Sequence, residues 1–177
     1  RLNRIVIDSS NPRFGIATSG KSYLDVMQAL DDMGITEAVA AEIGLRVYKI
    51  AMSWPLEPDT THEFAEGLEE ILVVEEKRSI IEDQLMGQLY NYPVKARPRV
   101  FGEFDENGAD LLPNVSELTP AMIALVIAQR IGRFYQSETM AQRVKWIQDK
   151  KAKTSNIFSY ENKGVKKTIQ LFSQGGY

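Results

Sequence analysis

The fold is decided by the stretch Gly15-Ile-Ala-Thr-Ser-Gly-Lys-Ser-Tyr-Leu-Asp-Val-Met-Gln-Ala-Leu-Asp-Asp-Met-Gly34. It opens with a short apolar run that stops at Gly20, and its later apolar residues recur at helical spacing until Gly34. Ser22 and Asp25 have the spacing of a capping box, so we expect the helix to open at Ser22. A strand followed directly by a helix favours an α/β fold.

Outward from this stretch, strand and helix signals continue to alternate. Strands are predicted at 47–52, 71–74 and 99–104, with 4–7 as a lead-in or edge strand. Helices are predicted at 38–45 and 63–70 and from Ser79 onward. Four strands separated by helices imply right-handed crossovers in an open, mostly parallel sheet.

The C-terminal third of the sequence has a different pattern. Thr119 suits a helix N-cap and Pro120 the first helical turn, and the apolar residues from Met122 to Ile131 predict a helix that belongs to a core or a domain interface. A less apolar helical stretch follows, and the sequence becomes polar and lysine-rich after Lys150. We expect four parts: a lead-in segment (1–13), an α/β domain (14–112), a helical extension (113–150) and a polar linker or extension to a next domain (151–177).

The composition excludes several kinds of chemistry. The chain has 177 residues, 44% of them hydrophobic and 25% charged, which is typical of one compact domain. It has no cysteine, which excludes disulfides, a thiol nucleophile and cysteine-ligated metal centres within these residues. The single histidine, His62, excludes a multi-histidine metal site and is expected on the surface near a helix start.

The charge distribution and the targeting signals limit the possible partners and the location of the chain. The net charge is −3, and the basic residues concentrate in 141–177. No aromatic residues interleave them as a stacking platform for nucleic acid would require, so a solvated helix end is the preferred interpretation. We expect no nucleic acid and no membrane as partner, and a cytoplasmic location, because no apolar run reaches about 20 residues and no signal-peptide pattern is present. Since Arg1 stands in place of methionine, we expect a processed chain or a piece of a longer protein.

One motif suggests nucleotide binding. Residues 15–22 match G-x-x-x-x-G-K-[ST], in which backbone N–H groups and the lysine bind phosphates and the hydroxyl binds Mg²⁺. In a true phosphate loop, however, the first glycine follows a strand, whereas here the strand itself runs through Gly15. Pro12 just before it cannot lie in a central strand. A nucleotide-binding module therefore remains an alternative function, and an unrelated protein-interaction domain is a second alternative.

Several stretches together resemble a known family. Residues 15–34, 48–58 and 64–77 occur in the order of one domain of indolepyruvate:ferredoxin oxidoreductases, a domain similar to the C-terminal domain of transketolases. The match extends over about residues 14–105. The resemblance implies a three-layer α/β/α fold around an open, mostly parallel sheet of about five strands, one of them antiparallel, with extra C-terminal helices here. It also implies a packing and assembly role.

The resemblance implies a multidomain parent enzyme. Such a parent contains thiamine diphosphate, Mg²⁺ and iron–sulfur clusters, and it oxidatively decarboxylates aryl 2-oxo acids such as indolepyruvate. The acyl group passes to coenzyme A as co-substrate and the electrons to ferredoxin. The present chain has neither a G-D-G…N segment nor cysteine, so we expect no catalytic residue, no metal ligand and no cofactor within it. The expected partners are neighbouring domains of the parent, ferredoxin and, in a homo-oligomer, a second copy.

If any residues of this chain approach a ligand, they lie in loops at the carboxyl ends of the strands, where open α/β sheets form crevices. The cofactor-binding candidates are Gly20, Lys21, Ser22, Trp54, Glu75 and Glu76. Each also has a structural interpretation. Gly20 suits a turn, Lys21 a solvated position and Ser22 a cap, Trp54 with Pro55 fixes a turn, and the glutamates are capped, solvated or at an interface.

Overall fold

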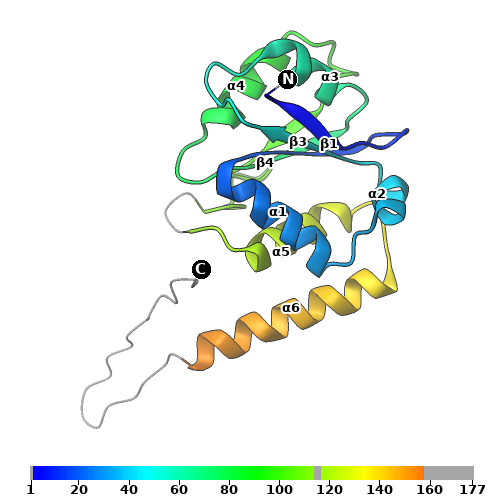
Figure 1. The fold of residues 1–177 in the computed structure, drawn as a ribbon, viewed down its shortest axis with the longest axis vertical. Coiled ribbons are helices and arrows are strands. Elements are labelled where there is room, and N and C mark those ends of the chain that lie inside the picture. Colours follow the sequence, from blue (N-terminus) through cyan, green and yellow to red (C-terminus); the bar gives the residue numbers. More distant parts are fainter. Residues whose placement is uncertain (1, 114–116, 158–177) are drawn as a thin grey trace, which may run out of the picture.

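The computed structural model describes residues 2–113 and 117–157, with side chains as far as Ala152. Across these residues one five-stranded sheet has the order β1-β3-β2-β4-β5 (Figure 1). The strands are β1 (Arg4–Ile7), β2 (Phe14–Ser19), β3 (Leu45–Ile50), β4 (Glu70–Val74) and β5 (Arg99–Phe101). The edge strand β1 is antiparallel to β3, and all other pairs are parallel. The expected sheet of five strands with one antiparallel strand is therefore confirmed.

Helices cover both faces of this sheet and complete three layers (Figure 1). The helices are α1 (Gly20–Asp32), α2 (Glu37–Ile43), α3 (Pro58–Ala65), α4 (Ile80–Leu89), α5 (Pro120–Ile131) and α6 (Glu138–Ile157). Buried residues of α1, α2 and α5 form one core with the sheet, and those of α3 and α4 form a second core on the opposite face. Helix α6 lies outside α1 and α5. Among the described residues, no helix combines the length and the apolar character needed to cross a bilayer.

Strand β2 lies at the centre of the sheet and is buried on both faces. Phe14 and Ile16 belong to the core under α1 and α5, whereas Ala17 belongs to the core under α3 and α4. Gly15 faces the second core, where a Cβ atom would lie 2.5 Å from Cδ1 of Leu68 and 2.8 Å from Cζ of Phe64. A glycine is needed at this position because a side chain would occupy the space that Phe64 fills.

The start of α1 differs from the expectation. The helix begins at Gly20, whose φ of +55° suits glycine, and not at Ser22. Ser22 is buried in the first turn at 2% exposure, so it is not a cap, and Ser19 at the N-cap position makes no side-chain cap hydrogen bond. The left-handed glycine turns the chain from β2 directly into the helix, so the capping box predicted with Asp25 does not form.

The bounds of α3 and the position of His62 within it were predicted wrongly. Helix α3 spans Pro58–Ala65 in place of 63–70, because the Glu57 carboxylate accepts the N–H groups of Asp59 and Thr60 at 2.7 and 2.9 Å and starts the helix earlier. Glu70 belongs to β4. The histidine is consequently in the last turn of α3, half-buried, with its ring 5.4 Å from that of Tyr92, and not near a helix start.

The C-terminal helices match the sequence pattern more closely. The Thr119 side chain accepts the Met122 N–H at 3.3 Å and Pro120 occupies the first turn, as predicted. Apolar residues of α5 are fully buried in the first core, which confirms the core interpretation of this helix. Helix α6 continues past Lys150 to Ile157, into the range for which the sequence indicated a linker. The four-part division of the chain stays a prediction, and most of its last part lies outside the described residues.

The packing around Gly15 predicts the effect of adding one methyl group. Gly15→Ala should lower the free energy of unfolding by about 1–3 kcal/mol, because the methyl group overpacks the second core against Phe64 and Leu68. Gly87→Ala, in α4 with no neighbouring atom within 4 Å of a Cβ, should instead stabilise the chain by about 0.5–1 kcal/mol. Urea unfolding of both variants measures the difference, and equal effects would contradict the close packing of β2.

Candidate functional site

The parallel strands bring some of the candidate residues together at their carboxyl edge. Lys21 follows β2 and Glu76 follows β4, and Nζ of Lys21 lies 3.6 Å from Oε1 of Glu76. The same ammonium group lies 2.8 Å from Oδ2 of Asp25 and 3.2 Å from Oε1 of Glu117. Lys21 is thus the centre of a cluster of three carboxylates and is not simply solvated, as the sequence suggested.

These carboxylates govern the chemistry of Lys21. The hydrogen bond to Asp25, followed by those of the other acidic neighbours, outweighs partial desolvation and raises the lysine pKa above its ordinary value of 10.5. The amine therefore stays protonated near neutral pH, and it cannot act as a base or a nucleophile there. Its charge is already balanced by neighbouring carboxylates.

The phosphate-loop pattern does not form a phosphate loop. Residues 14–19 are strand β2, which pairs with β3 on one side and β4 on the other, so its backbone N–H groups serve the sheet. Gly15 is packed in the second core and is not at the strand end. An anion near Lys21 would also meet three carboxylates. The geometry therefore speaks against the nucleotide-binding alternative.

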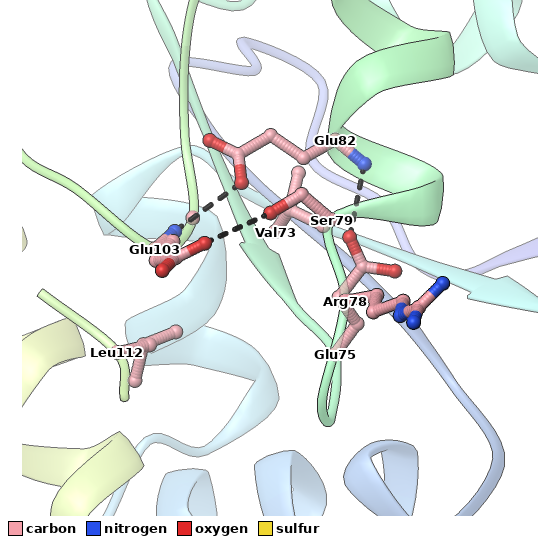
Figure 2. Close-up of a pocket in the computed structure, with 8 residues that line it drawn as sticks. Val73, Glu75, Arg78, Ser79, Glu82, Glu103 and Leu112 are labelled. Carbon is pink, nitrogen blue, oxygen red and sulfur yellow. Dashed lines mark hydrogen bonds between the residues drawn. The ribbon is translucent and has the colours of Figure 1, made fainter. Parts of the chain in front are cut away.

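Glu75, at the end of β4, holds the start of α4 (Figure 2). Its carboxylate accepts the Ile81 N–H at 2.9 and 3.1 Å and the Glu82 N–H at 3.1 Å. Ser79 occupies the N-cap position but makes no side-chain cap hydrogen bond. Burial raises the pKa of Glu75 above 4.5, while these N–H donors favour the charged form. Glu75 therefore caps the start of α4.

A small hollow lies beside Glu75, between β4, the start of α4 and the chain after β5 (Figure 2). The Glu103 N–H donates to Oε2 of Glu82 at 3.2 Å, and the Ser79 hydroxyl donates to Oε2 of Glu103 at 3.3 Å. The cavity volume is about 10 Å³, which is room for about one water molecule. Within the part of the chain that the structure describes, no group of three or more acidic or histidine side chains is placed to hold a metal ion.

Thiamine diphosphate, which the family resemblance implies for a parent enzyme, does not fit here. The hollow is far smaller than the several hundred Å³ of a typical organic ligand site. Lys21 is paired with carboxylates. Glu75 and Glu82 accept hydrogen bonds from backbone N–H groups of the same domain. We therefore derive no catalytic step for these residues.

Trp54 does not join the Lys21 cluster but lies in the loop between β3 and α3. Its side chain is 72% exposed. Asn3 holds the start of the loop, since its Oδ1 accepts the N–H groups of Ala51 and Met52, each at 2.9 Å. Gln84 of α4 holds the rest, since its amide accepts the Leu56 N–H and donates to the Ser53 carbonyl, both at 2.7 Å. The loop is therefore fixed while its tryptophan faces solvent.

Sequence reasoning missed the buried charged residues, of which Arg130 is the most buried at 1% exposure. Arg130 of α5 has a fully buried side chain, which donates to Glu70 of β4 and to Glu106 at 2.7 Å and lies 4.2 Å above the Phe101 ring. It joins α5 to the sheet. A signal was present, because Arg130 falls on the same helical face as Ile123 and Ile127, where a buried residue is expected.

The buried carboxyl groups predict a pH dependence of stability. Burial raises the pKa of Glu82 above 4.5, so the stabilisation that comes from its protonated form is complete below pH 4.5 and is lost as the pH rises through the raised value. In urea titrations, the free energy of unfolding of the wild type, relative to that of Glu82→Gln, should therefore fall as the pH rises from 4.5 through the raised pKa of Glu82.

Glu106 provides a control of opposite sign. Its hydrogen bond from Arg130 lowers its pKa to about 2, so the stabilisation it contributes is present above pH 4.5 and is lost as the pH falls toward 2. Relative to Glu106→Gln, the wild type should lose stability on acidification. The same sign of change for Glu82 and Glu106 would contradict the difference in their environments.

Comparison with known proteins places this fold in a family. The model of the indolepyruvate ferredoxin oxidoreductase middle domain matches residues 3–112. The indolepyruvate oxidoreductase subunit IorA of Thermococcus kodakarensis is 27% identical over 120 residues, which cover 68% of this chain and 16% of that protein. IorA of Methanothermobacter marburgensis is 32% identical over 85 residues, covering 48% of this chain and 12% of that protein.

Solved structures agree on the fold. The 2-oxoglutarate:ferredoxin oxidoreductase of Magnetococcus marinus, solved with 2-oxoglutarate, coenzyme A and succinyl-CoA bound, superposes with a TM-score of 0.50 at 15% identity over 74% of this chain and 20% of that chain. The matches thus span only a small part of each relative's length. Because the family model extends over more than half of the sequence, the chain belongs to the indolepyruvate ferredoxin oxidoreductase middle-domain family.

Proposed function

We propose that this chain is a non-catalytic packing and assembly domain of a multidomain enzyme. That parent oxidatively decarboxylates aryl 2-oxo acids such as indolepyruvate to acyl-CoA and passes the electrons to ferredoxin. Family membership supports the parent reaction and disfavours an unrelated interaction domain. Thiamine diphosphate, Mg²⁺ and the iron–sulfur clusters then belong to other parts of the parent, and ferredoxin is a partner of the whole enzyme.

The observation that carries this proposal is the closed carboxyl edge of the sheet. In open α/β folds this edge is where ligands bind. Here Lys21 is paired with three carboxylates, Glu75 caps α4, and the adjoining hollow has room for about one water molecule. Polar groups that are satisfied inside the domain stabilise its own fold, so these candidates have structural roles.

The Trp54 loop supports the assembly role. Hot spots of protein interfaces are enriched in tryptophan, and a rigid anchor loses little conformational entropy on binding. Asn3 and Gln84 hold the loop from both sides while the indole is 72% exposed. We propose that this tryptophan packs against a neighbouring domain of the parent.

The absence of a cofactor role can be tested directly. Isothermal titration of the 177-residue chain with thiamine diphosphate and Mg²⁺ should give no binding heat at micromolar ligand, whereas the parent enzyme should bind under the same conditions. The chain should also fail to decarboxylate indolepyruvate. Saturable binding to the chain that is weakened by Lys21→Ala or Glu75→Gln would refute the non-catalytic role.

The packing role predicts a selective effect of Trp54→Ala. In the parent, this variant should weaken the attachment of the neighbouring domain by about 2 kcal/mol or more, the cost typical of a tryptophan hot spot. Limited proteolysis between domains and the thermal midpoint of the parent report this loss.

Tyr90→Ala is the matched control, since Tyr90 is also 72% exposed but lies at the end of α4. It should leave both measurements unchanged. In the isolated chain both variants should unfold like the wild type. If the Trp54→Ala parent resists proteolysis between its domains as well as the wild type does, that result would count against the packing role.

A further inference from the structure

The chain between β5 and α5 makes a tight turn on the surface over residues 105–108. The Asp105 carbonyl accepts the Gly108 N–H at 3.1 Å, and Gly108 has a φ of +77°, which suits glycine. Oδ1 of Asp105 also accepts the N–H groups of Asn107 and Ala109 at 2.8 and 2.9 Å. Asn107 and Gly108 are both exposed, and among the described residues nothing lies within 4 Å of a Cβ atom placed on Gly108. This Asn-Gly pair is therefore open to water.

An asparagine that precedes a glycine can react with the backbone of its neighbour. The Gly108 nitrogen attacks Cγ of Asn107, so that an N–Cγ bond forms, the Cγ–Nδ2 bond breaks, and ammonia leaves with the proton of the attacking nitrogen. The product is a five-membered cyclic imide. Water then opens the imide at one of its two carbonyl groups and gives either aspartate or isoaspartate, in which the main chain runs through Cγ. The reaction needs water alone, and glycine favours it because no side chain crowds the attacking nitrogen.

The closed form of the turn does not prevent this attack. The hydrogen bond from Gly108 to Asp105 lies at the surface, where turns open locally at low free-energy cost. Such openings take nanoseconds to microseconds, whereas the loss of the amide group is a slow reaction during which many openings occur. The open turn is therefore the reactive form.

Asn107 is the only asparagine of the sequence that precedes a glycine. Asn91 is also exposed, but it precedes Tyr92. The Tyr92 N–H donates to the Leu89 carbonyl at 3.0 Å, and the tyrosine ring lies 5.4 Å from that of His62. Because the tyrosine side chain crowds its own nitrogen and is held by packing, Asn91 provides a matched site of low reactivity.

The residue before Asn107 holds a buried charge. Oε2 of Glu106 accepts Nη1 of Arg130 at 2.7 Å, and Oε1 of Glu106 lies 2.6 Å from Nη1 of Arg133. The Arg130 side chain is fully buried, and within the described part of the chain its Nη2 has no hydrogen-bond partner. Without Glu106, the guanidinium group would keep only Glu70 as a carboxylate partner. Loss of one partner of a buried charge is costly, so the turn contributes to holding α5.

We propose that Asn107 is a site of spontaneous modification and that its conversion to isoaspartate releases Glu106 from Arg130. Isoaspartate adds one methylene group to the main chain of a turn whose N–H groups are fixed on Asp105. It also places a new carboxylate beside Asp105 and Glu106, where an amide stood. Helix α5 then loses one of the ties that hold it in place. This inference goes beyond the proposed function, since it does not depend on the reaction of the parent.

Incubation of the purified 177-residue chain at mildly alkaline pH tests the proposal, because the attacking nitrogen must lose its proton. Ion exchange should separate a more acidic form that grows with time, and peptide mapping with an isoaspartate methyltransferase should locate isoaspartate at residue 107. Asn91 should stay unmodified, and Asn107→Ser, which cannot form the imide, should yield no isoaspartate there. A wild type without isoaspartate at residue 107, or one modified equally at Asn91, would overturn the proposal.

The thermal midpoint of the separated isoaspartate form measures the consequence for the fold. It should be lower than that of the fresh chain by about 2–4 °C or more, as expected when a buried charge loses one partner. Asn107→Asp adds the charge without the methylene group, so its midpoint should lie between the two. An unchanged midpoint of the isoaspartate form, or an Asn107→Asp chain as unstable as that form, would contradict the role of the longer main chain.

Glu106→Ala separates the effect on Arg130 from general damage to the turn. This variant removes the carboxylate before incubation, and circular dichroism verifies that it is folded. Conversion of Asn107 to isoaspartate should then lower its midpoint clearly less than it lowers that of the wild type, because both changes remove the same interaction. Equal decreases in the two chains would overturn the link between Asn107 and Arg130.

Discussion

Burial of β2 on both faces is the constraint on which the rest of the structure depends. A strand with helices on each side must satisfy all its backbone groups within the sheet, and β3 and β4 provide those partners. It must also tolerate two cores at once. Phe14 and Ile16 fill one core, while Gly15 leaves room for Phe64 in the other. This double packing excludes a phosphate-binding loop at residues 15–19, because a strand that pairs with two neighbours cannot also wrap around a phosphate.

The charged residues of this domain are used to join its layers. Arg130 connects α5 to β4 through Glu70, Glu75 joins the end of β4 to α4, and Lys21 draws together the ends of β2 and β4. A buried charge must be paired to be tolerated, so the carboxylate partners of the fully buried Arg130 are a condition of the fold. The same pairing engages the described polar groups of the carboxyl edge, where open α/β sheets commonly bind ligands. The exposed Trp54 lies away from the Lys21 cluster, on the loop after β3.

Local patterns predicted the strands well and the helix starts less well. The unbroken apolar run of β4 and the stop at Gly20 are signals within a few residues, and the structure confirms both. The cap of α4 comes from Glu75, which lies before the N-cap position and outside the usual capping spacing. The loop around Trp54 is held by Asn3, a residue distant in sequence that no local pattern identifies. Ser22 had the spacing of a cap but is buried, because Gly20 turns the chain into α1 earlier than the capping pattern requires.

The order of strands and helices, the family of the domain and the lack of cysteine chemistry were determined by the sequence alone, because periodicity, composition and ordered motifs are properties of the chain itself. Whether Lys21 meets a phosphate or carboxylates was decided only by the tertiary structure, which sets the ends of β2 and β4 side by side. The burial of Arg130 likewise depends on how α5 packs against β4 and β5. Electrostatic partners and surface hollows arise between segments far apart in the chain, so no stretch of sequence contains them.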